Sequence, residues 1–267
     1  MSTEDRDPST VDPVDEQPGS RSLHVPGTRR WRARVLLLGA AVALAVVVKS
    51  LFLQAFYIPS ASMEPGLVKD DRIVVEKVSS WGDRGPRRGD VVVFQDPGDW
   101  LLPEPAPGAL GRALEKVGLR PGGGHLVKRV VGVAGDVVVC CDDRGRISVN
   151  GEPLDESGYT RLDGAPCAGP MTRTCSWSAG PVPAGHLFVM GDHRSNSDDS
   201  TMHLCPETGA ETGTGTGAGC APGEEFVPAD LVVGRVVALA WPAGHARLLH
   251  RPGTFDAVPD APEAPRE

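Results

Sequence analysis

The sequence has few aromatic residues and no excess of positive charge. Aromatic residues make up 5% of its 267 residues, and the formal net charge is -8. Proteins that bind nucleic acid present a basic surface, so this charge argues against a nucleic-acid partner. Hydrophobic residues make up 40% of the chain, which is ordinary for a globular protein. The length is sufficient for one or two domains with a buried core.

Common zinc-binding motifs are also absent. The chain contains neither Cys-x-x-Cys nor His-Glu-x-x-His, so we expect no metal ion and no other cofactor. Its six cysteines suit disulfide bonds if the domain lies outside the cytoplasm. We expect Cys167 to pair with Cys175, and Cys205 with Cys220, because each pair closes a short loop. The adjacent cysteines at 140–141 remain unassigned.

Only one apolar run approaches membrane-spanning length. Val35–Val48 is an unbroken stretch of fourteen residues, and four arginines between residues 29 and 34 precede it. A helix of about 22 residues is about 33 Å long, close to the bilayer core of about 30 Å. We therefore predict a transmembrane helix over 35–56 that follows a disordered, cytoplasmic segment over 1–34. A cleaved signal peptide and a buried core helix are the alternatives.

The rest of the chain favours strands. Gly and Pro are abundant, with 33 and 25 residues, and Asn150-Gly151 predicts a hairpin over 147–154. Six segments have apolar patterns that predict strands: 73–78, 91–94, 126–133, 137–141, 186–190 and 231–241. We expect residues 96–124 to be a surface insertion with a short helical patch at 110–117. Residues 205–223 are expected to be a flexible loop and residues 251–267 a flexible tail.

Two serines stand two residues apart directly after the apolar run. They belong to the stretch Tyr-Ile-Pro-Ser-Ala-Ser-Met-Glu-Pro at 57–65. The prolines at its two ends disfavour helix, and residues two apart in an extended segment face the same side. Ser60 and Ser62 are therefore predicted to face one site. Taken alone, serines beside prolines are equally typical of an ordinary turn.

Lys128 lies within an apolar strand pattern. A lysine accepts a proton only when it is neutral, and burial lowers its pKa from about 10.4 toward that condition. The alternative is a lysine whose amino group reaches solvent, which is the usual arrangement. The neighbouring Arg129 then either faces water or forms an ion pair.

Three segments, in this order, resemble the motifs of type I signal peptidases: 57–65, Lys-Arg-Val-Val-Gly-Val-Ala-Gly-Asp at 128–136, and Gly-Asp-His-Arg-Ser-Asn-Ser-Asp-Asp-Ser at 191–200. Those enzymes are membrane-bound serine/lysine endopeptidases that remove signal peptides from exported preproteins. The resemblance implies a mainly β fold, with an antiparallel catalytic domain over 57–250. It also implies a smaller inserted β domain, which we place at 137–186, and a single-pass protein of the plasma membrane.

The resemblance implies a role for each matching residue. Ser62 matches the nucleophile and Lys128 the general base of an acyl-enzyme mechanism. Ser60 matches a donor of the oxyanion hole, and Ser197 matches the serine that orients the lysine. Four further residues match structural polar positions near the site: Arg129, Asp192, Arg194 and Asp199.

Substrate and partners follow from the same resemblance. The partners would be the lipid bilayer and preprotein signal peptides with Ala-x-Ala cleavage sites. The peptide would bind in an extended form as an added strand. From their positions, we expect four residues to line shallow pockets for its small side chains: Ile58, Pro59, Met63 and Val127.

Two positions depart from the family pattern. His193 stands where asparagine is usual, and Thr201 stands where arginine is usual, which leaves the partner of Asp199 open. His193 also permits a Ser/His/Asp triad with Asp192 or Asp199. Two other functions compete: a self-cleaving, repressor-like serine/lysine protease, and a membrane-anchored β domain that binds a partner without catalysis.

Overall fold

The structure is a computed structural model of the whole chain. It describes the following residues: 27–78, 85–98, 100–101, 108, 124–167, 175–205 and 222–261. The expected disordered segment before residue 27, the helical patch at 110–117 and most of the 205–223 loop lie outside them.

The described chain begins with a helix, α1, over Gly27–Phe52. The prediction of disorder is therefore wrong for residues 27–34, and the predicted helix over 35–56 is wrong for residues 53–56. Residues Leu53–Tyr57 form strand β1 instead, because their backbone pairs with strand β2 at Arg72–Glu76. Of the helices in the described residues, none combines the length and the hydropathy that crossing a membrane requires.

The main sheet has eight strands in the order β1-β2-β11-β3-β4-β9-β10, with β12 paired to β11, and all its pairings are antiparallel. Its other strands are β3 Val91–Gln95, β4 His125–Val133, β9 His186–Met190, β10 Val227–Pro228, β11 Val232–Trp241 and β12 Arg247–Leu248. The strands predicted at 73–78, 91–94, 126–133, 186–190 and 231–241 are thus confirmed within a few residues. The mainly β, antiparallel fold is also as expected.

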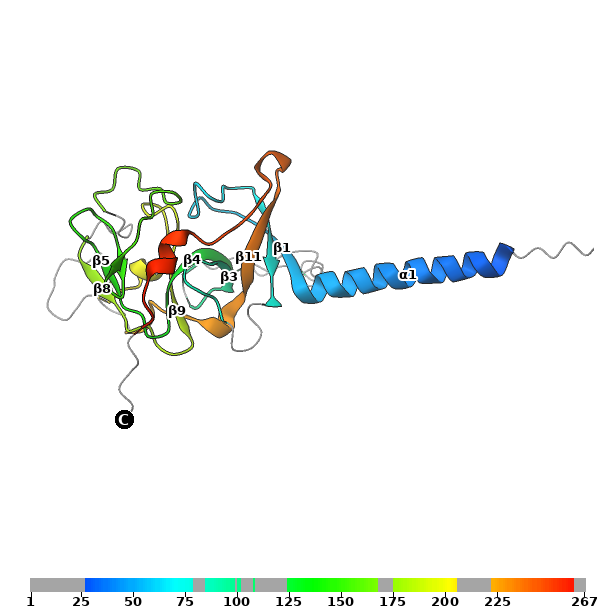
Figure 1. Cartoon of the computed structure of the whole chain (residues 1–267), viewed down its shortest axis with the longest axis horizontal. Helices are drawn as coiled ribbons and strands as arrows, with labels where there is room; N and C mark the ends of the chain where they lie inside the picture. Colours follow the sequence, from blue (N-terminus) through cyan, green and yellow to red (C-terminus); the bar gives the residue numbers. More distant parts are fainter. Residues whose placement is uncertain are drawn as a thin grey trace, which may run out of the picture. The chain divides into compact units, whose positions relative to one another are not determined.

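A second, smaller sheet lies within the range expected for an inserted domain. It contains β5 Val138–Cys140, β6 Ser148–Val149, β7 Glu152–Pro153 and β8 Trp177–Ala179, in the order β7-β6-β5-β8. The hairpin turn is confirmed at Asn150 and Gly151, whose φ values of 52° and 83° suit a tight two-residue loop. Within the β domain, β5 and β8 lie at the opposite end from β1 (Figure 1).

Part of the expected flexible tail is folded. Residues Gly253–Ala257 form a short 3₁₀ helix, η5, and Phe255 and Val258 are buried. Both pack in one hydrophobic cluster with residues of the two sheets, such as Val138 of β5 and Phe188 of β9. The prediction is therefore wrong for residues 251–261, because the apolar side chains at 255 and 258 complete the core between the sheets. Residues 262–267 lie outside the described part.

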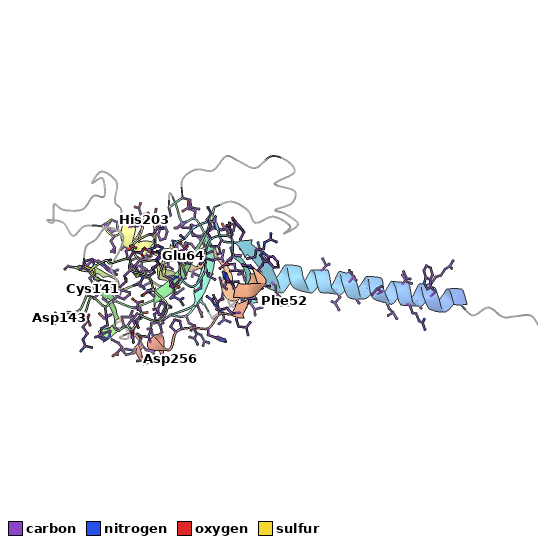
Figure 2. The ribbon with its side chains drawn as sticks, turned by 90° about the horizontal axis from the view of Figure 1, so that it is seen from above. Phe52, Glu64, Cys141, Asp143, His203 and Asp256 are labelled. Carbon is purple, nitrogen blue, oxygen red and sulfur yellow. A yellow bond between two sulfur atoms is a disulfide. The ribbon has the colours of Figure 1, made fainter. Side chains whose placement is uncertain are left out.

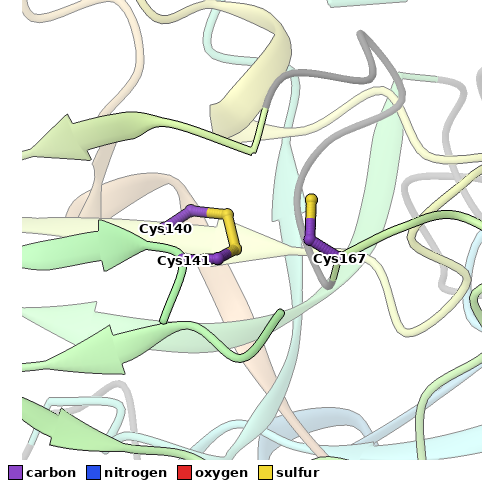
Figure 3. Close-up of side chains that lie close together, drawn as sticks. All are labelled: Cys140, Cys141 and Cys167. Atoms are coloured by element: carbon purple, nitrogen blue, oxygen red, sulfur yellow. A yellow bond between two sulfur atoms is a disulfide. The ribbon is translucent and has the colours of Figure 1, made fainter. Parts of the chain in front are cut away.

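Two disulfides are present among the described residues. The predicted Cys167–Cys175 pair is confirmed, and Cys140 bonds to its neighbour Cys141. The predicted partner of Cys205 is at position 220, outside the described residues. The sulfur atoms of Cys140, Cys141 and Cys167 lie within 4.8 Å of one another (Figure 3). All three are oxidised, so this cluster offers no thiolate for a metal ion.

Gly234 allows β11 to lie close to its neighbouring strand β2. A Cβ atom there would lie 2.9 Å from Val75 Cγ1 and would overlap the carbonyl oxygen of Glu76. We expect Gly234→Ala to lower the free energy of unfolding by about 1–3 kcal/mol, because overpacking displaces the backbone. Urea unfolding measures this. Gly244→Ala, where a Cβ would meet nothing within 4 Å, is the control and should shift stability by less than about 0.5 kcal/mol. Equal stabilities of the two variants would contradict the prediction.

Candidate active site

The three motif segments meet beside the central strands of the main sheet. Ser60 and Ser62 belong to the loop after β1, and Lys128 lies on β4. Strand β9 pairs with β4 and delivers the 191–200 segment to the same place. Ser60, Ser62 and Lys128 all line one cavity of about 430 Å³. The topology therefore brings together residues that are far apart in the sequence.

The two serines face the same side, as predicted. Their hydroxyl oxygens are 3.3 Å apart, with Ser62 buried and Ser60 exposed. The loop that carries them is tied at its base, where the Ile58 amide donates to Asp71 O and the Asp70 amide donates to Ile58 O, each at 2.9 Å. The loop is thus fixed to the sheet immediately before the serines.

Lys128 is buried, so the alternative with a solvated amino group is wrong. The residue is only 3% exposed, and its Nζ atom donates a hydrogen bond to Ser197 Oγ at 3.0 Å. Desolvation by burial lowers the pKa of Lys128, against the opposing charges of Asp199, Asp198 and Asp192. The amino group is accordingly shifted toward the neutral form that a proton acceptor needs.

Asp199 orients Ser197. The Ser197 hydroxyl donates to Asp199 Oδ2 at 2.6 Å, which leaves the oxygen lone pairs free to accept from Lys128. The same carboxylate accepts from the Gly191 amide and from the amide and hydroxyl of Thr201. Thr201 therefore supplies the partner of Asp199 that the sequence left open.

Gly191 permits close contact between the serine loop and the lysine's partner. A Cβ atom at Gly191 would lie 2.6 Å from Ser62 O and closer still to Ser197 Oγ. In addition, the His193 amide donates to Ser62 O at 3.0 Å. The backbone of Ser62 thus packs directly on the 191–200 segment.

The predicted structural residues form two buried ion pairs. Arg129 binds Asp192 through two hydrogen bonds of 2.7 Å and lies 4.4 Å from the centre of the Tyr159 ring. Arg194 binds Glu156 in the same two-pronged manner. Burial acts to lower the pKa of Arg129, but Asp192 outweighs it and the net shift is upward. Arg129 is therefore an ion-pair partner, and the alternative that it faces water is wrong.

Glu156 and Tyr159 were not identified from the sequence. They lie in a loop of the inserted region, whose local pattern indicates only a turn. Glu156 contacts Arg194 and Tyr159 contacts Arg129, and no short-range signal reveals these contacts.

The ring nitrogens of His193 form hydrogen bonds with groups other than the Ser62 hydroxyl. Its Nδ1 lies 3.1 Å from Ala61 O, and its Nε2 lies 2.6 Å from Asp163 Oδ2. The carboxylates of Asp192 and Asp199 are bonded to Arg129 and Ser197, as described above. The side chains therefore do not assemble the alternative Ser/His/Asp triad.

Three of the four predicted substrate-binding residues line the cavity. Ile58, Pro59 and Val127 do so, whereas Met63 is packed in the core with 1% exposure. Its side chain is directed into the sheet because the chain turns immediately after Ser62. The cavity is also lined by residues to which the sequence assigned no role, among them Trp100, Leu101, Asn196 and Asp198.

The burial of Lys128 should have a measurable cost in stability. Its pKa is lower in the folded than in the unfolded protein, so folding releases a proton over the pH range between the two values. Wild-type stability then rises with pH in that range, and Lys128→Met lacks this dependence. We expect the variant to be more stable than wild type, by a margin that grows as pH falls, at most by about 1.4 kcal/mol per pH unit.

Urea unfolding at several pH values measures this difference directly. Lys69→Met, at an exposed surface position, is the control and should follow the wild-type slope. A slope for Lys128→Met equal to that of wild type would show that the lysine is not shifted toward neutrality.

Comparisons with known proteins show the family of this chain. A family described as signal peptidase, peptidase S26, matches residues 31–241. A probable signal peptidase I of Mycobacterium leprae is 34% identical over 237 residues, covering 79% of this chain and 76% of that protein. The signal peptidase I of Mycobacterium tuberculosis is 36% identical over 228 residues, with coverages of 79% and 72%. A probable signal peptidase I-2 of Synechocystis is 30% identical over 245 residues, with coverages of 92% and 89%. The buried lysine, the paired serines and the match over most of the chain lead to one conclusion: this chain belongs to the signal peptidase family, peptidase S26.

Proposed function

We propose that this protein is a type I signal peptidase, in which Ser62 is the nucleophile and Lys128 the general base. It removes signal peptides from exported preproteins. The observation that carries the proposal is the buried, neutral-shifted Lys128 in the same cavity as Ser62. A serine hydroxyl attacks a peptide bond only when a base takes its proton, and a neutral amine can do so.

The contacts of Lys128 support this assignment. A neutral amine has two hydrogens and one lone pair. One hydrogen is donated to Ser197 Oγ, and the lone pair remains available for the proton of Ser62. As Ser62 Oγ bonds to the scissile carbonyl carbon, Lys128 takes the proton and then passes it to the leaving amine. Water repeats the sequence on the acyl-enzyme and restores Ser62.

The developing negative charge needs hydrogen-bond donors. We assign this role to the Ser60 hydroxyl and the Ser62 amide. The Ser60 hydroxyl is 3.3 Å from the Ser62 hydroxyl. The proposed donor therefore lies beside the proposed nucleophile, and the two act on the same substrate carbonyl. Removal of such a donor typically costs about 3–4 kcal/mol of transition-state stabilisation.

The cavity suits an extended peptide with small side chains. Ile58, Pro59 and Val127 line it beside the serines, and Trp100 closes part of the wall, stacked on His203 at 4.4 Å. We propose that Ala-x-Ala sites bind here along β4, because small residues leave room for the peptide backbone to approach Ser62.

We further propose that α1 anchors the protein in the plasma membrane with its N-terminus in the cytoplasm. Leu36, Leu37 and Leu38 are 67–73% exposed, which leaves an apolar helix surface to be covered by lipid. Arg32 and Arg34 precede this surface, as the positive-inside rule requires. Independently, the disulfides of the β domain fit an oxidising compartment outside the cytoplasm.

Cleavage of a preprotein with an Ala-x-Ala site, reconstituted in membranes with the full-length protein, tests the proposal. Ser62→Ala and Lys128→Met should each lower kcat by at least about 10⁴-fold, because each removes one half of a unit that acts together. Lys69→Met, at an exposed position, serves as the matched control and should retain activity. Full cleavage by Lys128→Met would refute the lysine base, and the absence of cleavage by wild type would refute the function.

Gly191→Ala tests the contact between the serine loop and Ser197. The added methyl group would separate Ser62 from Ser197, and a displacement of about 1 Å at a catalytic group can cost about 100-fold in rate. We expect kcat to fall by about that factor. Gly158→Ala, where a Cβ would meet nothing within 4 Å, should cleave normally. Wild-type rates in both variants would show that the close packing is unnecessary.

A further inference from the structure

We propose that His193, held with both ring nitrogens protonated, positions and polarises the Ser62 amide for the oxyanion hole. This inference rests on the proposed function and deepens it, because it assigns a role to a residue that departs from the family pattern. His193 would act through the backbone and would not touch the substrate.

Both ring nitrogens of His193 face atoms that only accept hydrogen bonds. Nδ1 is 3.1 Å from the carbonyl oxygen of Ala61, and Nε2 is 2.6 Å from Asp163 Oδ2. A neutral imidazole carries one N–H and could serve only one of these acceptors. The imidazolium form carries two and satisfies both. The ring is also enclosed, with 7% side-chain exposure.

Asp163 is maintained as a carboxylate. Arg161 Nε donates to its Oδ1 at 2.6 Å, and the same guanidinium reaches Glu64 at 2.7 Å. The hydrogen bond from Arg161, followed by that from His193, lowers the pKa of Asp163. Glu64 is two residues after Ser62 and is labelled in Figure 2. A chain of charged groups thus connects the serine loop with His193 through the inserted region.

The other charged groups near His193 are bonded elsewhere. The neighbouring Asp192 carboxylate binds Arg129, and the Arg194 guanidinium binds Glu156. Among the groups described, the anion in direct contact with the imidazole is therefore Asp163. This arrangement favours a positive charge on the ring.

The geometry of the peptide unit transmits this charge to the oxyanion hole. The carbonyl of Ala61 and the amide N–H of Ser62 belong to one planar group and point in opposite directions. Ala61 O accepts from His193 Nδ1 and from the Glu64 amide, so the Ser62 N–H is directed away from both. A cationic donor at the carbonyl polarises the amide and makes its N–H a stronger donor.

His193 holds the serine loop at a second point. Its own amide donates to Ser62 O at 3.0 Å. One residue therefore contacts the carbonyl groups on both sides of the Ser62 α-carbon. An asparagine at this position would have a single side-chain amide and could not carry the positive charge.

The experiment compares wild type with His193→Asn and His193→Phe in the membrane-reconstituted cleavage assay. We expect kcat to fall by about 10-fold in the Asn variant and about 100-fold in the Phe variant, with KM unchanged within about twofold. A peptide aldehyde, whose adduct with Ser62 places an oxygen in the oxyanion hole, should lose affinity in parallel with kcat. A peptide that binds without reacting should retain its affinity. A role limited to stability would not separate these two ligands.

The protonation of His193 is tested by the pH dependence of kcat and by a substitution of Asp163. If His193 carries a proton on both ring nitrogens, the ratio of wild-type to His193→Asn kcat should fall as pH rises. Asp163→Asn should lower kcat in the wild-type background and have no effect when combined with His193→Asn. Asp143→Asn is the control, since Asp143 lies at the edge of the domain away from Glu64 (Figure 2).

The outcomes are distinct from a failure of the proposed function. If wild type shows no cleavage that depends on Ser62 and no aldehyde adduct, the signal peptidase assignment itself is wrong, and this inference with it. If wild type cleaves and the His193 variants match it in kcat and aldehyde affinity, the inference alone is overturned. A constant wild-type to Asn ratio at all pH values would overturn the doubly protonated form.

Discussion

The buried amino group of Lys128 is the feature on which the rest of the site depends. It donates a hydrogen bond to the Ser197 hydroxyl, and Val130 and Val131 on the same strand are buried apolar residues. An ionised amine in such a place is costly, and the cost is what shifts the lysine toward its neutral form. The protein must therefore supply enough stability elsewhere to retain a group that a purely structural core would exclude.

Much of that stability comes from the central strands, and paired charges around them fix the geometry. Val92, Phe94 and Val189 are fully buried on β3 and β9, the strands on either side of β4. The buried pairs Arg129–Asp192 and Arg194–Glu156 fix the 191–200 segment. Removing one member of such a pair would leave an uncompensated charge, so the pairs specify the geometry more than they add net stability.

The two departures from the family pattern illustrate how local chemistry is maintained by different residues. Thr201 offers a hydroxyl and an amide to Asp199, so the carboxylate is satisfied without an arginine. His193 lies against the serine loop and reaches Asp163 in the inserted region. Both residues therefore supply hydrogen bonds in or beside the 191–200 segment, and the proposed charge on His193 lies next to the peptide that carries the proposed oxyanion donor.

The sequence by itself determined the strand segments, the Asn150-Gly151 turn and the short-range Cys167–Cys175 pairing. The alternation of apolar and polar residues, the turn residues and the length of the loop between the cysteines are all local features of the sequence. Local backbone energetics is therefore sufficient to predict these structures. The family motifs also identified Ser62 and Lys128 as candidates. The burial of Lys128, and the place of Met63 in the core, were decided only by strand order and side-chain direction.

The partners Glu156, Tyr159 and Asp163 likewise depended on the tertiary structure. They lie about 30–40 residues from Asp192, His193 and Arg194 in the sequence and meet them only where a loop of the inserted region crosses the end of β9. The folding of residues 251–261 against the core has the same origin, because a short apolar segment is indistinguishable from a loose tail until the surface that it covers exists. Local propensity fixes elements, whereas contacts between distant segments are set by the packing of the whole domain.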